Sequence, residues 1–224
     1  MKKKQQIYAE FRRLLDDPKS TERDTHRFLK KYPRIIIDLF NASWNYYICV
    51  PEFRFGTDYR ADFLVLSADS VVWHAVFIEL EAPHDEIYLK NETPSEALRI
   101  AQKQIAQWET YFSNHIGTVR REIAKVLKNK DVGAQNKLGR LAVDAHIEIA
   151  HPDTSIWDKY HIVIGRRSMR YNEKTGEPVP GSGYGESIVT YDRLLDKLKA
   201  IEENPYLTNT EGYLKWSDAH HRPF

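Results

Sequence analysis

The sequence predicts an α/β fold in which helices flank a mixed central sheet. Three observations support this class. Two helical patterns come first, and three strand-like segments follow as a group between residues 46 and 83. After residue 95, helical patterns alternate with further strand-like segments. The segment 70–83 is apolar on both faces until its end, which is typical of a strand covered by helices on both sides. This order of elements indicates an α/β sandwich.

The first half of the chain gives the clearest element boundaries. Apolar residues at helical spacing predict a helix over 5–15. Ser20 or Thr21 can cap a second helix that ends at Pro33. Strands are then predicted over 46–56, 59–68 and 70–83, the first two joined by a "GTD" turn.

The second half is predicted to alternate helices and strands. A long amphipathic helix over 95–113 leads into a basic helix. Two strands are expected over 143–152 and 160–168, with His146 and His151 flanking the first at opposite parity and therefore not sharing a site. After a Gly- and Pro-rich loop at 176–186, a final strand enters a helix through Thr190 as its cap.

Composition limits the class of protein. The chain has 224 residues, of which 42% are hydrophobic and 29% charged, as in ordinary globular proteins. Its single cysteine, Cys49, cannot form an internal disulfide. No long apolar run and no signal-peptide pattern occur, so we expect a cytoplasmic protein with no membrane partner. We expect an N-terminal helix at 1–19, one main domain at 20–202 and an irregular tail at 203–224.

The stretch "VFIELEAP" places carboxylates at the end of an apolar strand. Glu79 and Glu81 are two residues apart, so they share a strand face and repel each other. Asp62 lies where the preceding strand becomes apolar, and it approaches both if the two strands pair as a meander. Three converging carboxylates suit a hard cation such as Mg²⁺. The other interpretation is an edge strand whose acids face water or pair with Arg60.

Basic residues gather in two places although the net charge is only +1. The first patch lies within 119–140 and includes Arg120, Arg121 and Lys125, and the second includes Arg166 and Arg167. Such patches can follow the phosphate backbone of a nucleic acid. A solvated helix face would give the same pattern.

Several motifs together resemble a known family. "ADFLVL", "FIELEAP" and the helix "AQKQIAQW" are similar to the PD-(D/E)XK nuclease superfamily, and more narrowly to the Shedu-type domain of bacterial anti-phage defence proteins. The segments "TERDTHRFLKKYP", "HIVIGRR" and "IVTYDRLLDKL" resemble further elements of that family in the same order. The resemblance covers most of the chain, from about Ser20 to Leu198.

The resemblance implies a restriction-endonuclease-like core that cleaves DNA with Mg²⁺ or Mn²⁺. Asp62 and Glu79 would be metal ligands, and Glu22 would be an acid of the first helix near the metal. Gln104 would reach the site from the long helix, with Gln102 as the alternative, because residues two apart on a helix do not share a face.

One position departs from the family pattern. The family carries a lysine two residues after the strand glutamate, where this chain has Glu81. That lysine orients the attacking water and stabilises developing negative charge, which a carboxylate cannot do. Glu81 could be a further metal ligand or a general base. The alternative is a non-catalytic DNA-binding or assembly module on a nuclease fold, and assembly into a homo-oligomer is compatible with either interpretation.

Overall fold

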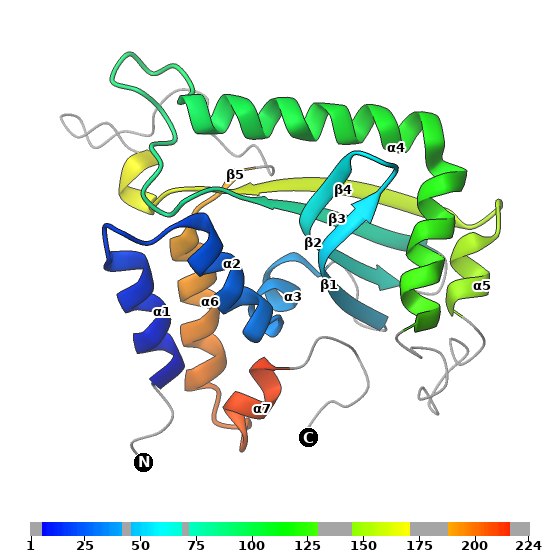
Figure 1. Ribbon diagram of the computed structural model, residues 1–224. Helices are drawn as coiled ribbons and strands as arrows, with labels where there is room; N and C mark the ends of the chain where they lie inside the picture. Colours follow the sequence, from blue (N-terminus) through cyan, green and yellow to red (C-terminus); the bar gives the residue numbers. More distant parts are fainter. Residues whose placement is uncertain (1–5, 42–45, 69–71, 130–144, 171–187, 216–224) are drawn as a thin grey trace.

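The fold is α/β, as predicted, with a five-stranded mixed sheet between two layers of helices (Figure 1). The computed structural model describes residues 6–41, 46–68, 72–129, 145–170 and 188–215. This architecture is compatible with a restriction-endonuclease-like core. Within the described ranges, no helix is both long enough and apolar enough to span a membrane.

The sheet has the strand order β1-β2-β3-β4-β5. The strands are β1 (Tyr46–Phe55), β2 (Tyr59–Ala68), β3 (Val72–Leu80), β4 (Ser155–Val163) and β5 (Ile188–Val189). The first three form the expected antiparallel meander, whereas β4 and β5 are parallel to β3. The side chains of β2 and β3 are almost entirely buried, which confirms that both faces of the sheet centre are covered.

Helices cover the two faces unequally (Figure 1). One face carries α4 (Glu96–Asn129) and α5 (Ala145–Ala150), and the other carries the remaining α-helices. The helices are α1 (Gln6–Asp16), α2 (Glu22–Lys31), α3 (Arg34–Phe40), α4 (Glu96–Asn129), α5 (Ala145–Ala150), α6 (Tyr191–Glu203) and α7 (Thr210–Leu214), with a short 3₁₀ helix, η2 (Arg167–Arg170). Thr21 and Thr190 directly precede α2 and α6, as the capping patterns predicted.

The predicted strand over 143–152 is wrong, because this segment contains the helix α5. The sequence "AHIEIA" alternates like a strand, but the buried residues are Ala145 and Ile149, four positions apart. Ile147 lies between them and is 57% exposed, so the helical period decides the structure. Trp73 of β3 fixes the helix by donating from Nε1 to Glu148 Oε1 at 3.3 Å.

Three other features of the helices differ from those predicted. The helix α3 was missed, because Ile35, Ile36 and Ile37 are all buried and consecutive apolar residues hide a helical stripe. The long and basic helices form one element, α4, with a kink at His115. The tail contains α7, whose Leu214 is buried, and is therefore not wholly irregular.

Some predicted features lie outside the described residues. These are the Gly- and Pro-rich loop at 176–186 and the end of the basic segment from residue 130 onward.

The strand predicted over 160–168 begins earlier, at Ser155, and ends at Val163. Arg166 and Arg167 therefore follow the strand rather than continue it.

Candidate active site

Asp62 and Glu79 lie across from each other on neighbouring strands. The pairing of Phe63 with Ile78 brings the next residue of each strand, Asp62 and Glu79, to adjacent positions. The backbone N–H of Leu80 donates to Asp62 Oδ2 at 2.8 Å, and Asp62 is only 8% exposed. The side chain of Asp62 therefore reaches the end of β3, where Glu79 stands.

A helix residue holds Glu79 in place. Gln104 Nε2 of α4 donates to Glu79 Oε1 at 2.8 Å. Gln102, the alternative, is exposed. The structure thus joins Glu79 to Gln104 and places Asp62 beside Glu79 on the neighbouring strand.

Glu81 and Glu22 lie at the rim of this pair. Glu81 follows β3 directly, and its backbone N–H donates to the carbonyl of Val163 at 2.9 Å. Its side chain is half-buried. Glu22 is the first residue of α2 and interacts electrostatically with Asp62 and Glu81.

The acids raise one another's pKa values. Burial raises the pKa of Glu79 to about 9, and repulsion from Asp62, Glu81 and Glu22 adds to the effect. Burial also raises the pKa of Glu81 to about 7, together with repulsion from Glu22, Asp85 and Asp62. The pKa values of Asp62 and Glu22 are raised as well, in each case first by burial. Ionising the cluster is costly, and a bound cation would lower that cost.

The donor set suits a hard divalent cation. In the part of the chain that the structure describes, no three His, Cys, Asp or Glu side chains form a complete metal-binding group. Mg²⁺ does not require one, because it keeps several waters and commonly binds through one or two carboxylates and the substrate phosphate. Asp62 and Glu79 supply two adjacent carboxylates. In each carboxylate, one oxygen accepts the hydrogen bond described above. The residues present fit such an ion.

His26 is a residue of the site that the sequence interpretation missed. Its ring centroid lies 5.0 Å from that of Phe63, the residue after Asp62, and both Asp62 and Glu22 influence its pKa. Burial lowers the pKa of His26, so the ring is neutral at neutral pH. The signal was available, because His26 follows Glu22 by four residues and shares its face of α2.

Tyr191 contacts the backbone of the site from α6. This first residue of α6 is completely buried, and its hydroxyl donates to the backbone carbonyl of Glu81 at 2.7 Å. The same hydroxyl lies 3.0 Å from Thr25 Oγ1 of α2. One phenol therefore connects α2, α6 and the end of β3, which gives a structural reason for the tyrosine in "IVTYDRLLDKL".

Two of the five basic side chains predicted to bind DNA instead contact other groups of the protein. Arg120 donates to the carbonyls of His151 and Thr154. Arg166 forms ion pairs with Asp192 at 3.2 Å and Asp16 at 2.9 Å, and its side chain is 20% exposed. These guanidinium groups hold segments of the fold together.

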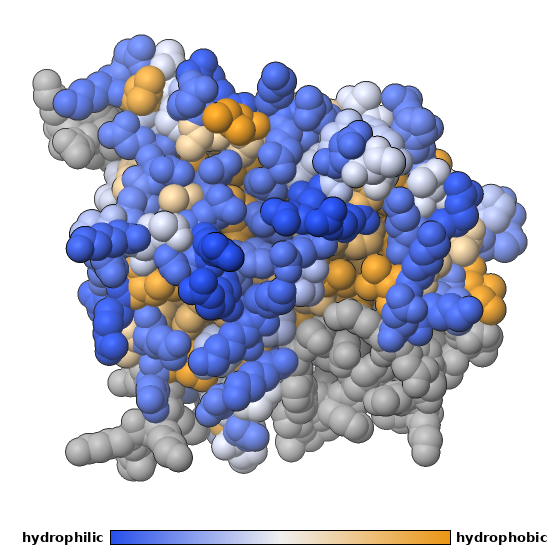
Figure 2. Space-filling model, viewed as in Figure 1, coloured by the Kyte–Doolittle hydropathy of each residue, from blue (hydrophilic) through white to orange (hydrophobic). Residues whose placement is uncertain are grey.

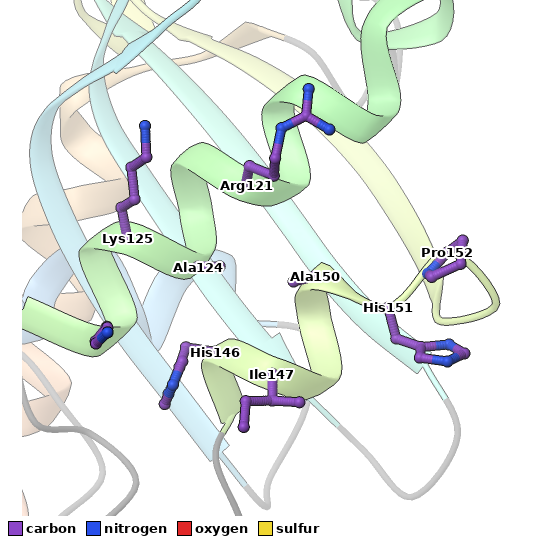
Figure 3. A pocket seen from close by; sticks show the side chains of 9 residues that line it. Arg121, Ala124, Lys125, His146, Ile147, Ala150, His151 and Pro152 are labelled. Atoms are coloured by element: carbon purple, nitrogen blue, oxygen red, sulfur yellow. The ribbon is translucent and has the colours of Figure 1, made fainter.

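The other predicted cations lie at the surface. Arg121 and Lys125 line an open groove of about 530 Å³ between the C-terminal half of α4 and α5 (Figure 3). His146 and His151 line the same groove, which corrects the expectation that they could not share a site and follows from α5 being a helix. Arg167 is exposed and pairs with Asp196. Figure 2 shows a mainly hydrophilic face, with hydrophobic atoms reaching the surface on either side of this half of α4.

A comparison with known families gives one match. The model of the family "Shedu protein SduA, C-terminal" matches residues 19–195. The matched region includes all five described strands, α2 and the whole of the carboxylate cluster. No curated protein matches the chain.

Proposed function

Because the chain belongs to the family of the C-terminal part of the Shedu protein SduA, we propose that it is a metal-dependent nuclease that hydrolyses DNA in anti-phage defence. Family membership supports the defence role. The observation that supports hydrolysis is the pair Asp62 and Glu79 on adjacent strands, with Gln104 bound to Glu79. We place this activity in the cytoplasm.

Each side chain has a separate task in this proposal. Asp62 and Glu79 would hold Mg²⁺ or Mn²⁺, which when bound polarises the scissile phosphate and lowers the pKa of a bound water. Gln104 fixes the orientation of the Glu79 carboxylate through its hydrogen bond. Tyr191 and Val163 fix the backbone of Glu81 at the rim.

Glu81 is the residue we assign to proton transfer. A general base works best when its pKa lies near the working pH. In the metal-free protein the surroundings of Glu81 raise its pKa to about 7, through burial first and then its acidic neighbours. A carboxylate in this state can accept a proton from water, a task that differs from that of the lysine found in the family. A role as a further ligand is the other assignment.

We assign contact with the DNA backbone to Arg121, Lys125 and Arg167. These three are exposed, and the first two stand one helical turn apart on α4. Arg120 and Arg166 instead support the fold through their internal contacts.

A second candidate is a non-catalytic DNA-binding or assembly module. The observation that favours it is the acid at position 81, since the family lysine is absent. In that case the acidic cluster would have no catalytic role, and DNA would bind without being cleaved.

A cleavage assay with linear DNA and plasmid, in Mg²⁺ and in Mn²⁺, distinguishes the nuclease from the non-catalytic module. For a nuclease, Glu79→Gln and Asp62→Asn should abolish cleavage, whereas Glu86→Gln, a change at an exposed acid of the following turn, should not. Glu81→Gln should lower the rate and remove its rise with pH if Glu81 is the base. Absence of cleavage by the wild-type protein, with DNA binding intact, would favour the module.

A further inference from the structure

A second open groove lies between the β1–β2 turn and the N-terminal half of α4. Its volume is about 430 Å³. The residues that matter here are Tyr59 of β2 and, from α4, Lys103, Gln107, Tyr111, Asn114 and His115. We call this surface the aromatic groove.

Three rings form a row along it. The ring centroids of Tyr59 and Tyr111 are 5.1 Å apart, and those of Tyr111 and His115 are 4.6 Å apart. Tyr59 and Tyr111 are partly exposed and His115 is exposed. The row therefore combines fixed aromatic faces with access from solvent.

The turn holds Tyr111 in position. Gly56 has φ +63°, and a Cβ there would lie 2.7 Å from Cζ of Tyr111, so only glycine allows this approach. Glu122, further along α4, accepts from the N–H of Gly56 at 3.1 Å with both carboxylate oxygens. The turn and α4 are thus joined, and the groove between them keeps its shape.

Two residues of the aromatic groove lie close in sequence to residues of the carboxylate cluster. Tyr59 precedes Asp62 by three residues on β2, a distance of roughly 10 Å along the strand. Gln107 stands one helical turn from Gln104, which binds Glu79. A strand of DNA whose scissile phosphate lies at Asp62 and Glu79 would enter this groove within one or two nucleotides.

We propose that the aromatic groove binds a single-stranded segment of the DNA substrate next to the scissile phosphate, by stacking its bases on Tyr59 and His115. This inference rests on the proposed nuclease function. A base stacks on a protein ring only when it is not already stacked in a duplex, so exposed aromatic faces favour single strands. The amides of Gln107 and Asn114 offer hydrogen bonds to base edges, and Lys103 offers one phosphate contact.

The groove between α4 and α5 differs in its chemistry. It carries Arg121, Lys125 and Lys128 around an apolar floor, and none of its described lining residues is a tyrosine, tryptophan or phenylalanine. Cations without stacking surfaces suit phosphate contact with a duplex. The two grooves together would hold a substrate in which a duplex passes into a single strand, such as an overhang or a gap.

Binding of labelled oligonucleotides tests the proposal independently of cleavage. Fluorescence anisotropy would compare a short oligo-dT with a duplex of equal length, in EDTA and in a Glu79→Gln background. Tyr59→Leu should weaken single-strand binding about tenfold, because one stacked base contributes about 1–3 kcal/mol. Its effect on the duplex should be less than about twofold. Tyr59→Phe keeps the stacking face and should bind like the parent protein.

Two controls complete the design. Tyr206 is 84% exposed outside the groove, so Tyr206→Leu should change neither affinity. Thermal melting of Tyr59→Leu would establish that the variant is folded. The proposal is overturned if folded Tyr59→Leu binds the single strand like the parent protein, or loses both ligands equally. If Tyr59→Leu loses single-strand binding but the wild-type protein never cleaves DNA, the aromatic groove remains a single-strand binding site. Only the proposed nuclease function is then rejected.

Discussion

Replacing Glu79 by glutamine should stabilise the metal-free protein, most of all at alkaline pH. The pKa of Glu79 is raised from 4.5 to about 9, first by burial and then by Asp62. Between these two values the folded state keeps a proton that the unfolded state releases, so the stability of the wild-type protein falls as pH rises through this window. Glutamine is neutral at every pH, and its carbonyl can still accept from Gln104.

The size of the effect follows from the shift. At ~1.4 kcal/mol for each pH unit, the full shift of Glu79 corresponds to an upper limit of roughly 6 kcal/mol. Side-chain relaxation, water entry and sharing of the charge with Asp62 reduce this cost. We therefore expect Glu79→Gln to gain about 2–3 kcal/mol near pH 9, and little near pH 5. For a chain of this length, that gain corresponds to a rise in Tm of about 5–10 °C.

Thermal unfolding in EDTA, followed by circular dichroism at a series of pH values, measures the gain. The exposed Glu86→Gln change serves as the control, since its melting temperature should follow the wild type throughout. Adding Mg²⁺ should narrow the difference, because the cation stabilises the ionised wild-type cluster and not the variant. Parallel melting curves for wild type and Glu79→Gln across the whole pH range would refute the view that the cluster resists ionisation.

Three further results are expected. Millimolar Mg²⁺ or Mn²⁺ should raise the Tm of the wild-type protein, and Asp62→Asn should reduce that rise; calorimetry showing no ion binding with or without DNA would contradict the metal assignment. Arg121→Gln with Lys125→Gln should lower the slope of log affinity against log salt by about 2 in DNA titrations, whereas Arg166→Ala should leave the slope unchanged and lower the Tm. Tyr191→Phe should cost about 1–3 kcal/mol in chemical unfolding, because the carbonyl of Glu81 and the hydroxyl of Thr25 lose a buried partner; stability equal to wild type would exclude the supporting role of this hydroxyl.

The sequence predicted the part of the fold in which local pattern and tertiary packing agree. The meander of β1, β2 and β3 was clear because both sheet faces are covered and a "GTD" turn separates the first two strands. The prediction failed at α5, because the short segment "AHIEIA" fits both the alternation of a strand and the period of a helix. Only the packing of Ile149 in the core and the exposure of Ile147 decide that case.

The candidate site shows a similar division. That Asp62, Glu79 and Gln104 lie close together could be predicted, because strand parity, helix periodicity and the motif order all point to these positions. The role of Tyr191, in contrast, could not be derived from local spacing. Tyr191 contacts Thr25 across 166 positions of the chain, and no spacing rule relates residues so far apart.

Charge was the least informative signal in the sequence. Arg120 and Arg121 are neighbours with the same charge, yet one donates to backbone carbonyls after α5 and the other lines an open groove. The difference arises because adjacent residues on a helix point about 100° apart, so a basic run necessarily divides between structural and surface roles.

The acid at position 81 can be understood through the same packing. Its backbone is fixed by Val163 and Tyr191, so substitution changes the carboxylate without moving the strand end. A lysine there would stand among Glu22, Asp62 and Asp85, whose repulsion now raises the pKa of Glu81. It would neutralise part of the charge that a divalent cation otherwise compensates. Glu81→Lys should therefore weaken Mg²⁺ binding in calorimetry while raising the metal-free Tm, and an unchanged Mg²⁺ affinity would separate Glu81 from the cation site.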